Sequence, residues 1–238
     1  MSWKLSNKFV YPSSTRSLIN GKRHYDVGTN EKLPSVTTIL SATQSEEKRK
    51  SLEAWKARMG AQRADRIRDL SAMRGTSMHT YLEGYIKDER HLDLTALGQE
   101  AGRMADVVIR SGLGDLEEVW GQEVTLYYPG LYAGATDIVG IYEGQPAIID
   151  FKQTNKPCQE YYSKVQDYYT QLAAYGEAHT SQYGPIEGGV ILMCSRDLVF
   201  QSFEIFDDKY ERYKEDWWKK YDHFIATSEQ PPQESEQK

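Results

Sequence analysis

Two aspartates and a lysine near the middle of the chain have the residue types and spacing of a metal-dependent catalytic group. Asp137, Asp150 and Lys152 lie in two apolar, β-branched segments separated by Glu143-Gly-Gln-Pro146. Gly beside Pro between two such segments is typical of a hairpin turn. With this turn at the centre, residue 137 would lie opposite residue 152, and residue 139 opposite residue 150.

This hairpin would bring the three charged side chains to one face, because side chains alternate along a strand and opposed residues share a face. Two neighbouring carboxylates repel each other unless a cation lies between them, and Mg²⁺ or Mn²⁺ prefers such hard oxygen ligands. A lysine beside the ion suits polarising a water or a phosphate oxygen, so the pattern predicts a phosphodiester-cleaving metal site. The alternative is a solvated face with weak cross-strand ion pairs. The residues predicted to point to the opposite face are Ile138, Ile149 and Phe151.

Four landmarks in the sequence resemble the PD-(D/E)XK nuclease superfamily and, within it, the RecB-like branch. Asp137 followed by Asp150-Phe-Lys152 resembles the superfamily pattern of an acid, a gap, and then acid-any-lysine. The segment Leu33-Pro-Ser-Val-Thr-Thr-Ile-Leu40 resembles the mitochondrial genome maintenance exonuclease subgroup and its phage relatives. The other two landmarks are Gly75-Thr-Ser-Met-His-Thr-Tyr-Leu-Glu83 and Gln171-Leu-Ala-Ala-Tyr175.

The resemblance implies further metal ligands around the two aspartates. In this branch the histidine that matches His79 reaches the metal from the helical side, which requires a neutral ring with one free nitrogen. The backbone carbonyl of Phe151 would assist, and an acid matching Glu123 would be a secondary ligand. Glu83, four residues after His79, is a further candidate. The alternatives are a surface or capped histidine and, for Glu123, a strand parity left open by the Pro129-Gly130 turn.

Gln171 and Tyr175 share one face of an expected helix, because they are four residues apart. The resemblance implies that they lie over the metal site, where they contact Lys152 or a DNA phosphate. The alternative is a polar edge beside a packed helix face. The chain departs from the branch after the lysine, where Gln153-Thr154 replaces the usual pair of small hydroxyl residues, so the phosphate contacts stay open.

The formal charge of −6 weighs against broad electrostatic capture of nucleic acid. The segment from Glu46 to Arg74 is a local exception, since nine Lys or Arg stand there against five Asp or Glu, a net +4. Such a segment is either a solvated helix face or an arch in which basic groups follow a single strand and aromatic rings stack on bases. Both interpretations predict that Arg63, Arg66 and Arg74 are exposed. The DNA-binding candidates are Arg63, Arg66, Arg74, Trp55, Tyr81 and Tyr175.

Composition limits the cofactors and partners. Cys158 and Cys194 are the only cysteines, too few for a disulfide framework or a four-cysteine iron–sulfur cluster, so the expected cofactor is Mg²⁺ or Mn²⁺. There is no apolar stretch of about twenty residues, so no membrane partner is expected. The first residues lack a secretory or arginine-rich leader, which favours a bacterial or phage-infected host cytoplasm.

The expected fold class is α/β, with a PD-(D/E)XK restriction-endonuclease-like core of a three-stranded meander, a helix and two further strands, preceded by an N-terminal helical insertion. The expected regions are a β-hairpin over 1–30, a helical DNA-gripping wall or arch with His79 over 31–114, the nuclease core over 115–226, and a disordered tail over 227–238. The expected strands are 8–11, 23–27, 119–128, 132–142, 147–152, 188–193 and 198–203. One expected helix starts at residue 35. The other expected helices span 43–70, 72–87, 94–111, 160–181 and 207–225.

The resemblance implies a Mg²⁺- or Mn²⁺-dependent deoxyribonuclease. Its substrate would be single-stranded DNA or duplex ends, and it would act as an exonuclease that leaves 5′-phosphates. Lys152 would orient the attacking water or help to deprotonate it. Two alternatives share the fold: a structure-selective DNA endonuclease, and a non-catalytic nucleic-acid-binding module.

Overall fold

A six-stranded mixed sheet forms the centre of the computed structural model, which describes residues 3–6, 8–89 and 91–228. Three of its strands form an antiparallel meander. The next strand runs parallel to the last strand of the meander, and the final strand pairs antiparallel with that next strand. This confirms the expected α/β class, with a central mixed sheet. In spatial order the strands are β1 (Lys4–Leu5), β5 (Leu116–Tyr128), β6 (Tyr132–Tyr142), β7 (Gln145–Thr154), β8 (Gly188–Ser195) and β9 (Phe200–Phe206).

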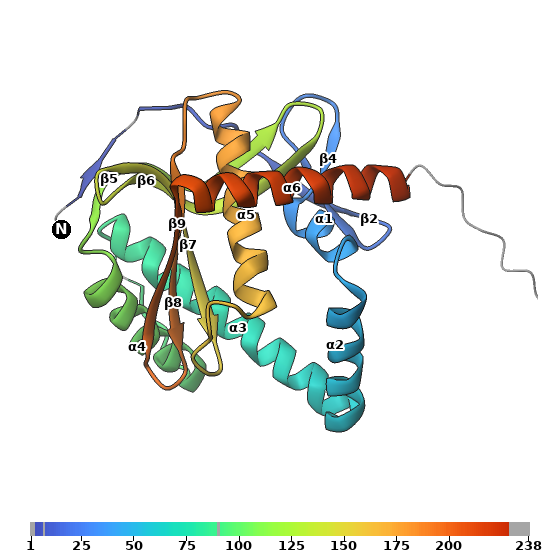
Figure 1. Ribbon diagram of the computed structural model, residues 1–238. Helices are drawn as coiled ribbons and strands as arrows, with labels where there is room; N and C mark the ends of the chain where they lie inside the picture. Colours follow the sequence, from blue (N-terminus) through green and yellow to red (C-terminus); the bar gives the residue numbers. More distant parts are fainter. Residues whose placement is uncertain (1–2, 7, 90, 229–238) are drawn as a thin grey trace, which may run out of the picture.

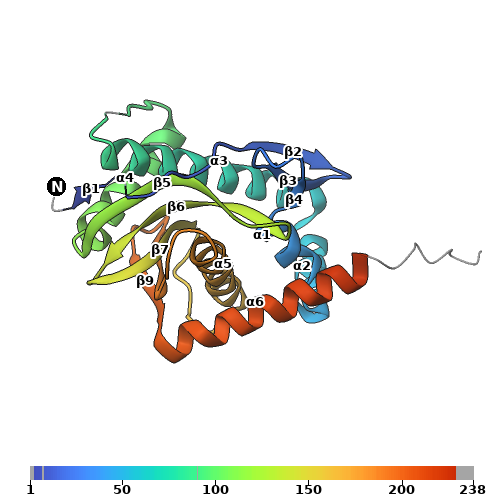
Figure 2. The same ribbon diagram turned by 90° about the horizontal axis from the view of Figure 1, so that it is seen from above.

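Helices cover both faces of this sheet (Figure 2). On one face lie α3 (Ala61–Ile86) and α4 (Ala96–Gly112); on the other lie α1 (Val36–Ala42), α5 (Ser163–Thr180) and α6 (Asp207–Ser228). Because both faces are covered, the central strands are apolar almost throughout: Ile148 packs toward α5, and its neighbour Ile149 packs toward α3 and α4. Among the described residues, no helix is both long enough and apolar enough to cross a bilayer.

The turn between β6 and β7 is tighter than the sequence suggested. Tyr142 pairs with Gln145, so Glu143 and Gly144 alone form the turn, with φ of 46° and 78°. The expected pairing is therefore wrong by two residues, and the register points Asp137 at Asp150 instead of at Lys152. A two-residue shift preserves the face of every side chain, so the predicted separation of charged and apolar residues is unaffected.

The amino-terminal hairpin differs from the expected one. β2 (Thr15–Ile19) pairs with β3 (Lys22–Asp26), which also pairs with β4 (Lys32–Pro34). The expected strand at residues 8–11 is not formed. Asn20 and Gly21 have φ of 51° and 73°, and this two-residue turn brings the segment directly before it against β3.

The charged helical segment breaks at a different place from the expected one. Ser45 caps α2 (Glu46–Met59) by accepting a hydrogen bond from the Lys48 N–H, and Gly60, with φ of 78°, separates α2 from α3. Residues 61–74 contain no Gly or Pro, so α3 continues through the expected boundary near residue 71. No residue of α2 is buried, and α2 extends with the start of α3 away from the sheet (Figure 1).

The closing helix also runs further than expected. Residues 227 and 228, placed in the predicted tail, are the last residues of α6. The rest of the predicted tail, residues 229–238, lies outside the described part of the chain.

The β6–β7 turn gives a stability prediction. We expect Gly144→Ala to lower the free energy of unfolding by about 1–2 kcal/mol, because an L side chain is unfavourable in the left-handed conformation. Gly114→Ala is the matched control, since Gly114 has no left-handed φ and open space where its Cβ would be. Urea unfolding followed by circular dichroism compares the two variants, and equal effects would contradict the assigned turn.

Candidate metal centre

The site forms where β6 and β7 stop pairing with each other. Their last paired residues are Ile138 and Ile149; beyond this point β6 continues along β5, and β7 continues along β8. The Phe151 N–H, free of a partner on β6, donates instead to the Asp137 carboxylate, with 2.6 Å between nitrogen and oxygen. Asp137 and Asp150 are 7% and 4% exposed. Two carboxylates therefore lie largely out of water at the end of one hydrogen-bond ladder.

His79 reaches Asp137 from α3, on the other side of the sheet. Its Nδ1 lies 2.9 Å from Asp137 Oδ1, and its ring meets the Phe151 ring edge-on. Burial alone would lower the pKa of His79, but the Asp137 charge outweighs it and raises that pKa to about 9. Burial would likewise raise the pKa of Asp137, yet His79 and Lys152 hold it well below its usual value. Without a metal, a proton on His79 balances the Asp137 charge.

Lys152 forms an ion pair with Asp150. The lysine Nζ also lies 4.9 Å from the centre of the Tyr168 ring, on α5. Burial lowers the pKa of Lys152, but the Asp150 charge more than compensates, so the pKa is raised and the group stays a cation. The pKa of Asp150 is raised to about 6, because loss of hydration outweighs the attraction of Lys152.

Glu123 joins this group from β5. The turn after β5 pairs Tyr128 with Tyr132, and the resulting register aims Glu123 across the strands at Asp137. Glu123 has φ of 51°, a left-handed conformation that costs roughly 1–3 kcal/mol for such a residue and is often found at functional sites. Desolvation, then the Asp137 charge, raises the pKa of Glu123 to about 7. The strand parity that the sequence left open therefore favours a ligand position.

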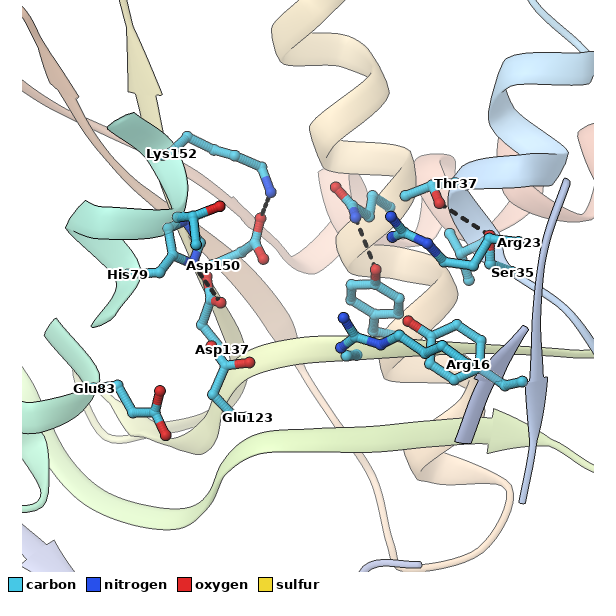
Figure 3. Close-up of a pocket in the computed structure, with 18 of the residues that line it drawn as sticks. Arg16, Arg23, Ser35, Thr37, His79, Glu83, Glu123, Asp137, Asp150 and Lys152 are labelled. Atoms are coloured by element: carbon cyan, nitrogen blue, oxygen red, sulfur yellow. Dashed lines mark hydrogen bonds and ion pairs between the residues drawn. The ribbon is translucent and has the colours of Figure 1, made fainter. Parts of the chain in front are cut away.

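The chemistry of the donors fits a divalent cation. One ligand atom each from His79, Glu123 and Asp137 lies within 4.8 Å of the others, and Asp150 adjoins them across the hairpin (Figure 3). Carboxylate oxygens suit Mg²⁺ and Mn²⁺, and a single imidazole is compatible with Mn²⁺ in particular. Desolvation is the main cause of the raised pKa of Glu123, and a cation would relieve the repulsion by Asp137 that adds to it. The Phe151 carbonyl stays a predicted ligand.

The group opens into a cavity of about 420 Å³. Glu83 lines this cavity and pairs with Lys87, with 2.5 Å between nitrogen and oxygen. Gln171 and Tyr175 also line it from α5, and Gln171 Nε2 donates to the Tyr175 hydroxyl at 2.7 Å. A Cβ at Gly134 would lie 2.4 Å from the Tyr175 ring, so a glycine at this position lets the tyrosine lie against β6.

The other DNA-binding candidates do not line this cavity. Arg63 and Arg66 are exposed on α3, and Trp55 is half-buried on α2. The Tyr81 hydroxyl accepts from the Asp93 N–H at 2.9 Å, which ties the ring to the loop before α4. Their role in DNA binding stays a prediction.

The predicted exposure of Arg74 is wrong, because its side chain is 4% exposed. Its Nη1 donates to Gln153 and Asn155, at 3.2 and 3.0 Å, and its Nε lies 3.3 Å from a Glu100 oxygen. Gln153 also donates to the Ser71 carbonyl at 2.8 Å. Gln153, at the position where the sequence departs from the RecB-like pattern, thus joins the helix of His79 to the strand of Lys152.

Two arginines that line the cavity were not among the sequence candidates. Arg16 and Arg23 come from β2 and β3 of the amino-terminal hairpin. The Asn20-Gly21 pair between them is a hairpin signal that would have placed both on paired strands. Their position next to the metal ligands depends on how the small sheet packs, which no local pattern gives.

The sequence is similar to that of a known exonuclease. It is 26% identical over 193 residues to mitochondrial genome maintenance exonuclease 1 of Mus musculus, covering 74% of this chain and 56% of the relative. The chain thus spans about half the length of that protein. No family model matches the sequence. The similarity supports a relationship with nucleases.

A solved structure of a candidate exonuclease from Eubacterium rectale aligns with 65% of each chain at 12% identity and a TM-score of 0.47. That value is too low to carry an argument about fold or function.

The paired His79 proton gives a prediction for metal binding. Because a ligating His79 must lose the proton it holds below about pH 9, we expect Mn²⁺ affinity to rise with pH, by roughly tenfold per unit between pH 7 and 9. Below about pH 7 protonated Glu123 adds to this dependence. Calorimetry in buffers of different ionisation enthalpy measures the protons released.

His79→Gln should remove most of this proton release above pH 7, whereas His223→Gln, at an exposed position on α6, should leave it unchanged. A metal affinity that is flat from pH 7 to 9 would exclude His79 as a ligand.

Proposed function

We propose that this protein is a Mg²⁺- or Mn²⁺-dependent deoxyribonuclease with a PD-(D/E)XK core. It acts as an exonuclease on single-stranded DNA and leaves 5′-phosphates. The observation that carries the proposal is the meeting of Asp137, Asp150, Lys152 and His79 at one end of an open cavity. The similarity to an exonuclease supports it independently of this geometry.

Asp137, Asp150, His79 and Glu123 would hold the metal, assisted by the Phe151 carbonyl. A bound Mg²⁺ or Mn²⁺ lowers the pKa of water and neutralises charge on the phosphate. The protein supplies the fixed positions of these donors: the Phe151 N–H anchors one oxygen of Asp137, and the ladder between β6 and β7 ends just before it. Both aspartates line the cavity, where a metal ion would meet their carboxylates.

Lys152 would orient the attacking water and stabilise the phosphate as a cation. Its raised pKa favours this role over proton abstraction, because a lysine must be neutral to act as a base. Attack in line with the 3′ oxygen would break the phosphorus–oxygen bond on that side and leave the phosphate on the 5′ carbon. Gln171 and Tyr175, joined by a hydrogen bond above this point, would limit how the strand lies in the cavity.

Activity measurements test the proposal. We expect Lys152→Ala to lower the rate of single-stranded DNA cleavage by about 10²–10⁴-fold, the usual contribution of a positioned polar group in catalysis. Asp137→Asn should be at least as damaging, and EDTA should abolish cleavage by the wild type. Lys156→Ala, at an exposed position four residues beyond Lys152, is the matched control and should keep full activity.

Comparison of linear with circular single-stranded DNA separates the two kinds of nuclease. An exonuclease degrades only the linear substrate, whereas cleavage of the circle would assign an endonuclease. Undiminished cleavage by homogeneous Lys152→Ala protein would falsify the mechanism altogether.

A further inference from the structure

The cavity is divided by charge into two parts. Its four carboxylates lie together with His79 and Lys152. The rest of the lining contains no acid, and its charged groups are the guanidinium groups of Arg16 and Arg23 (Figure 3). The four acids are Glu83, Glu123, Asp137 and Asp150.

The register of the small sheet directs both arginines to the same face. Arg16 pairs with Tyr25, and Leu18 pairs with Arg23, so alternation puts the two arginines and buried Tyr25 on one side. Lys32, paired with Asp26, belongs to the opposite face of the same sheet. The hairpin therefore presents arginines to the cavity and its other basic groups elsewhere.

Both arginines start from fixed positions. The Arg16 guanidinium carbon lies 5.6 Å from the centre of the Tyr25 ring, within the range of a cation–π contact. The Arg23 carbonyl accepts hydrogen bonds from the Ser35 N–H at 3.0 Å and from the Thr38 hydroxyl at 3.1 Å. These bonds anchor the backbone of β3 to the start of α1, so the position from which the Arg23 side chain extends is fixed before a ligand binds.

No acid pairs with either guanidinium group in the part of the chain that the structure describes, where fourteen other charge contacts occur within 4.0 Å. The planar guanidinium group of arginine presents two parallel N–H donors that match the oxygens of a phosphate. Two such groups at the wall of a cavity are suited to a phosphate dianion or to neighbouring phosphodiesters. The alternative is that both arginines are ordinary solvated side chains on an exposed hairpin. That alternative does not account for two arginines that line the same cavity as the candidate metal ligands.

We propose that Arg16 and Arg23 form a phosphate-binding subsite that holds the DNA strand beside the scissile bond. This inference rests on the proposed nuclease function and adds the part of the substrate that the hairpin recognises. The phosphate belongs either to an internal phosphodiester or to a strand terminus, since both present the same oxygens. The subsite makes the amino-terminal hairpin part of the substrate site.

Salt-dependent binding tests this subsite without depending on catalysis. The affinity of the full chain for a fluorescent oligothymidylate is measured by anisotropy at several KCl concentrations, with Ca²⁺ replacing Mg²⁺ and the oligonucleotide checked for integrity. We expect each of Arg16→Gln and Arg23→Gln to weaken binding several-fold and to reduce the slope of log K against log salt by about 0.7. Lys32→Gln makes the same charge change on the opposite face and should alter neither quantity.

Further arms exclude a folding defect and locate the phosphate. Arg23→Lys should restore most of the slope, because it keeps the charge, and thermal unfolding should be alike for all four variants. If the subsite holds a terminal phosphate, wild type will prefer 5′-phosphorylated over 5′-hydroxyl oligonucleotides, and Arg16→Gln/Arg23→Gln will lose that preference. If it holds an internal phosphate, the double variant will weaken binding of both oligonucleotides equally.

Unchanged affinity and slope in the double variant, with wild-type DNA cleavage intact, would overturn the subsite and leave the nuclease proposal standing. A wild type that neither cleaves nor binds DNA would overturn the proposed function, and the subsite with it.

Discussion

The hydrogen-bond ladder between β6 and β7 ends at Ile138 and Ile149, and the arrangement of the site follows from that point. Up to it the two strands exchange backbone bonds and bury Ile138 and Ile149 against α3 and α4. Past it, Asp137 takes the backbone N–H of Phe151 as a partner. The Asp137 carboxylate thus accepts the hydrogen bond that a backbone carbonyl of a paired strand would otherwise accept. A second carboxylate, that of Asp150, lies beside it with little access to water. Because these two carboxylates have lost hydration, their negative charges are unfavourable unless nearby positive charge compensates them.

Without a metal, protons on two neighbouring groups supply this compensation. His79 balances Asp137, and Lys152 balances Asp150; each basic group keeps a raised pKa in spite of burial. The contribution of the His79 proton to stability is present below its unfolded pKa, near 6.5, and is lost as the pH rises through about 9. A divalent cation can replace the His79 proton while Lys152 keeps its own. Because His79 must stay beside Asp137 in both states, its helix needs a fixed position relative to β7. Arg74, on the same helix, supplies this by donating hydrogen bonds to Gln153 of β7 and to Asn155 just after it.

The sequence predicted the faces of the hairpin better than its pairing. Strand parity repeats every two residues, so a register error of two left Asp137, Asp150 and Lys152 on the expected side. Glu123 could not be placed in advance, because bulges near Val119 and a turn of uncertain length lie between it and any fixed reference. The burial of Arg74 depends on Glu100 and Gln153, which are far from it in the chain; charge and helical period alone predict an exposed arginine. The same limit concealed Arg16 and Arg23, whose local pattern indicates a hairpin but not what the hairpin covers.

In the proposed nuclease, the charge division of the cavity would link metal binding to DNA binding. The protein carries a net charge of −6, and four carboxylates line the cavity, so a phosphate that approaches the metal-free site is repelled from that side. A bound divalent cation would weaken that repulsion and give a phosphate oxygen a positive charge to contact, while Arg16 and Arg23 would attract the strand in either state. Because coupling free energies are reciprocal, a strand that binds better to the metal-loaded site must also tighten the metal. In this proposal the arginines would set a basal affinity for DNA, and the carboxylates would make productive binding depend on the cation. The proposal thus explains how a protein with a net charge of −6 would select a DNA strand without a broad basic surface.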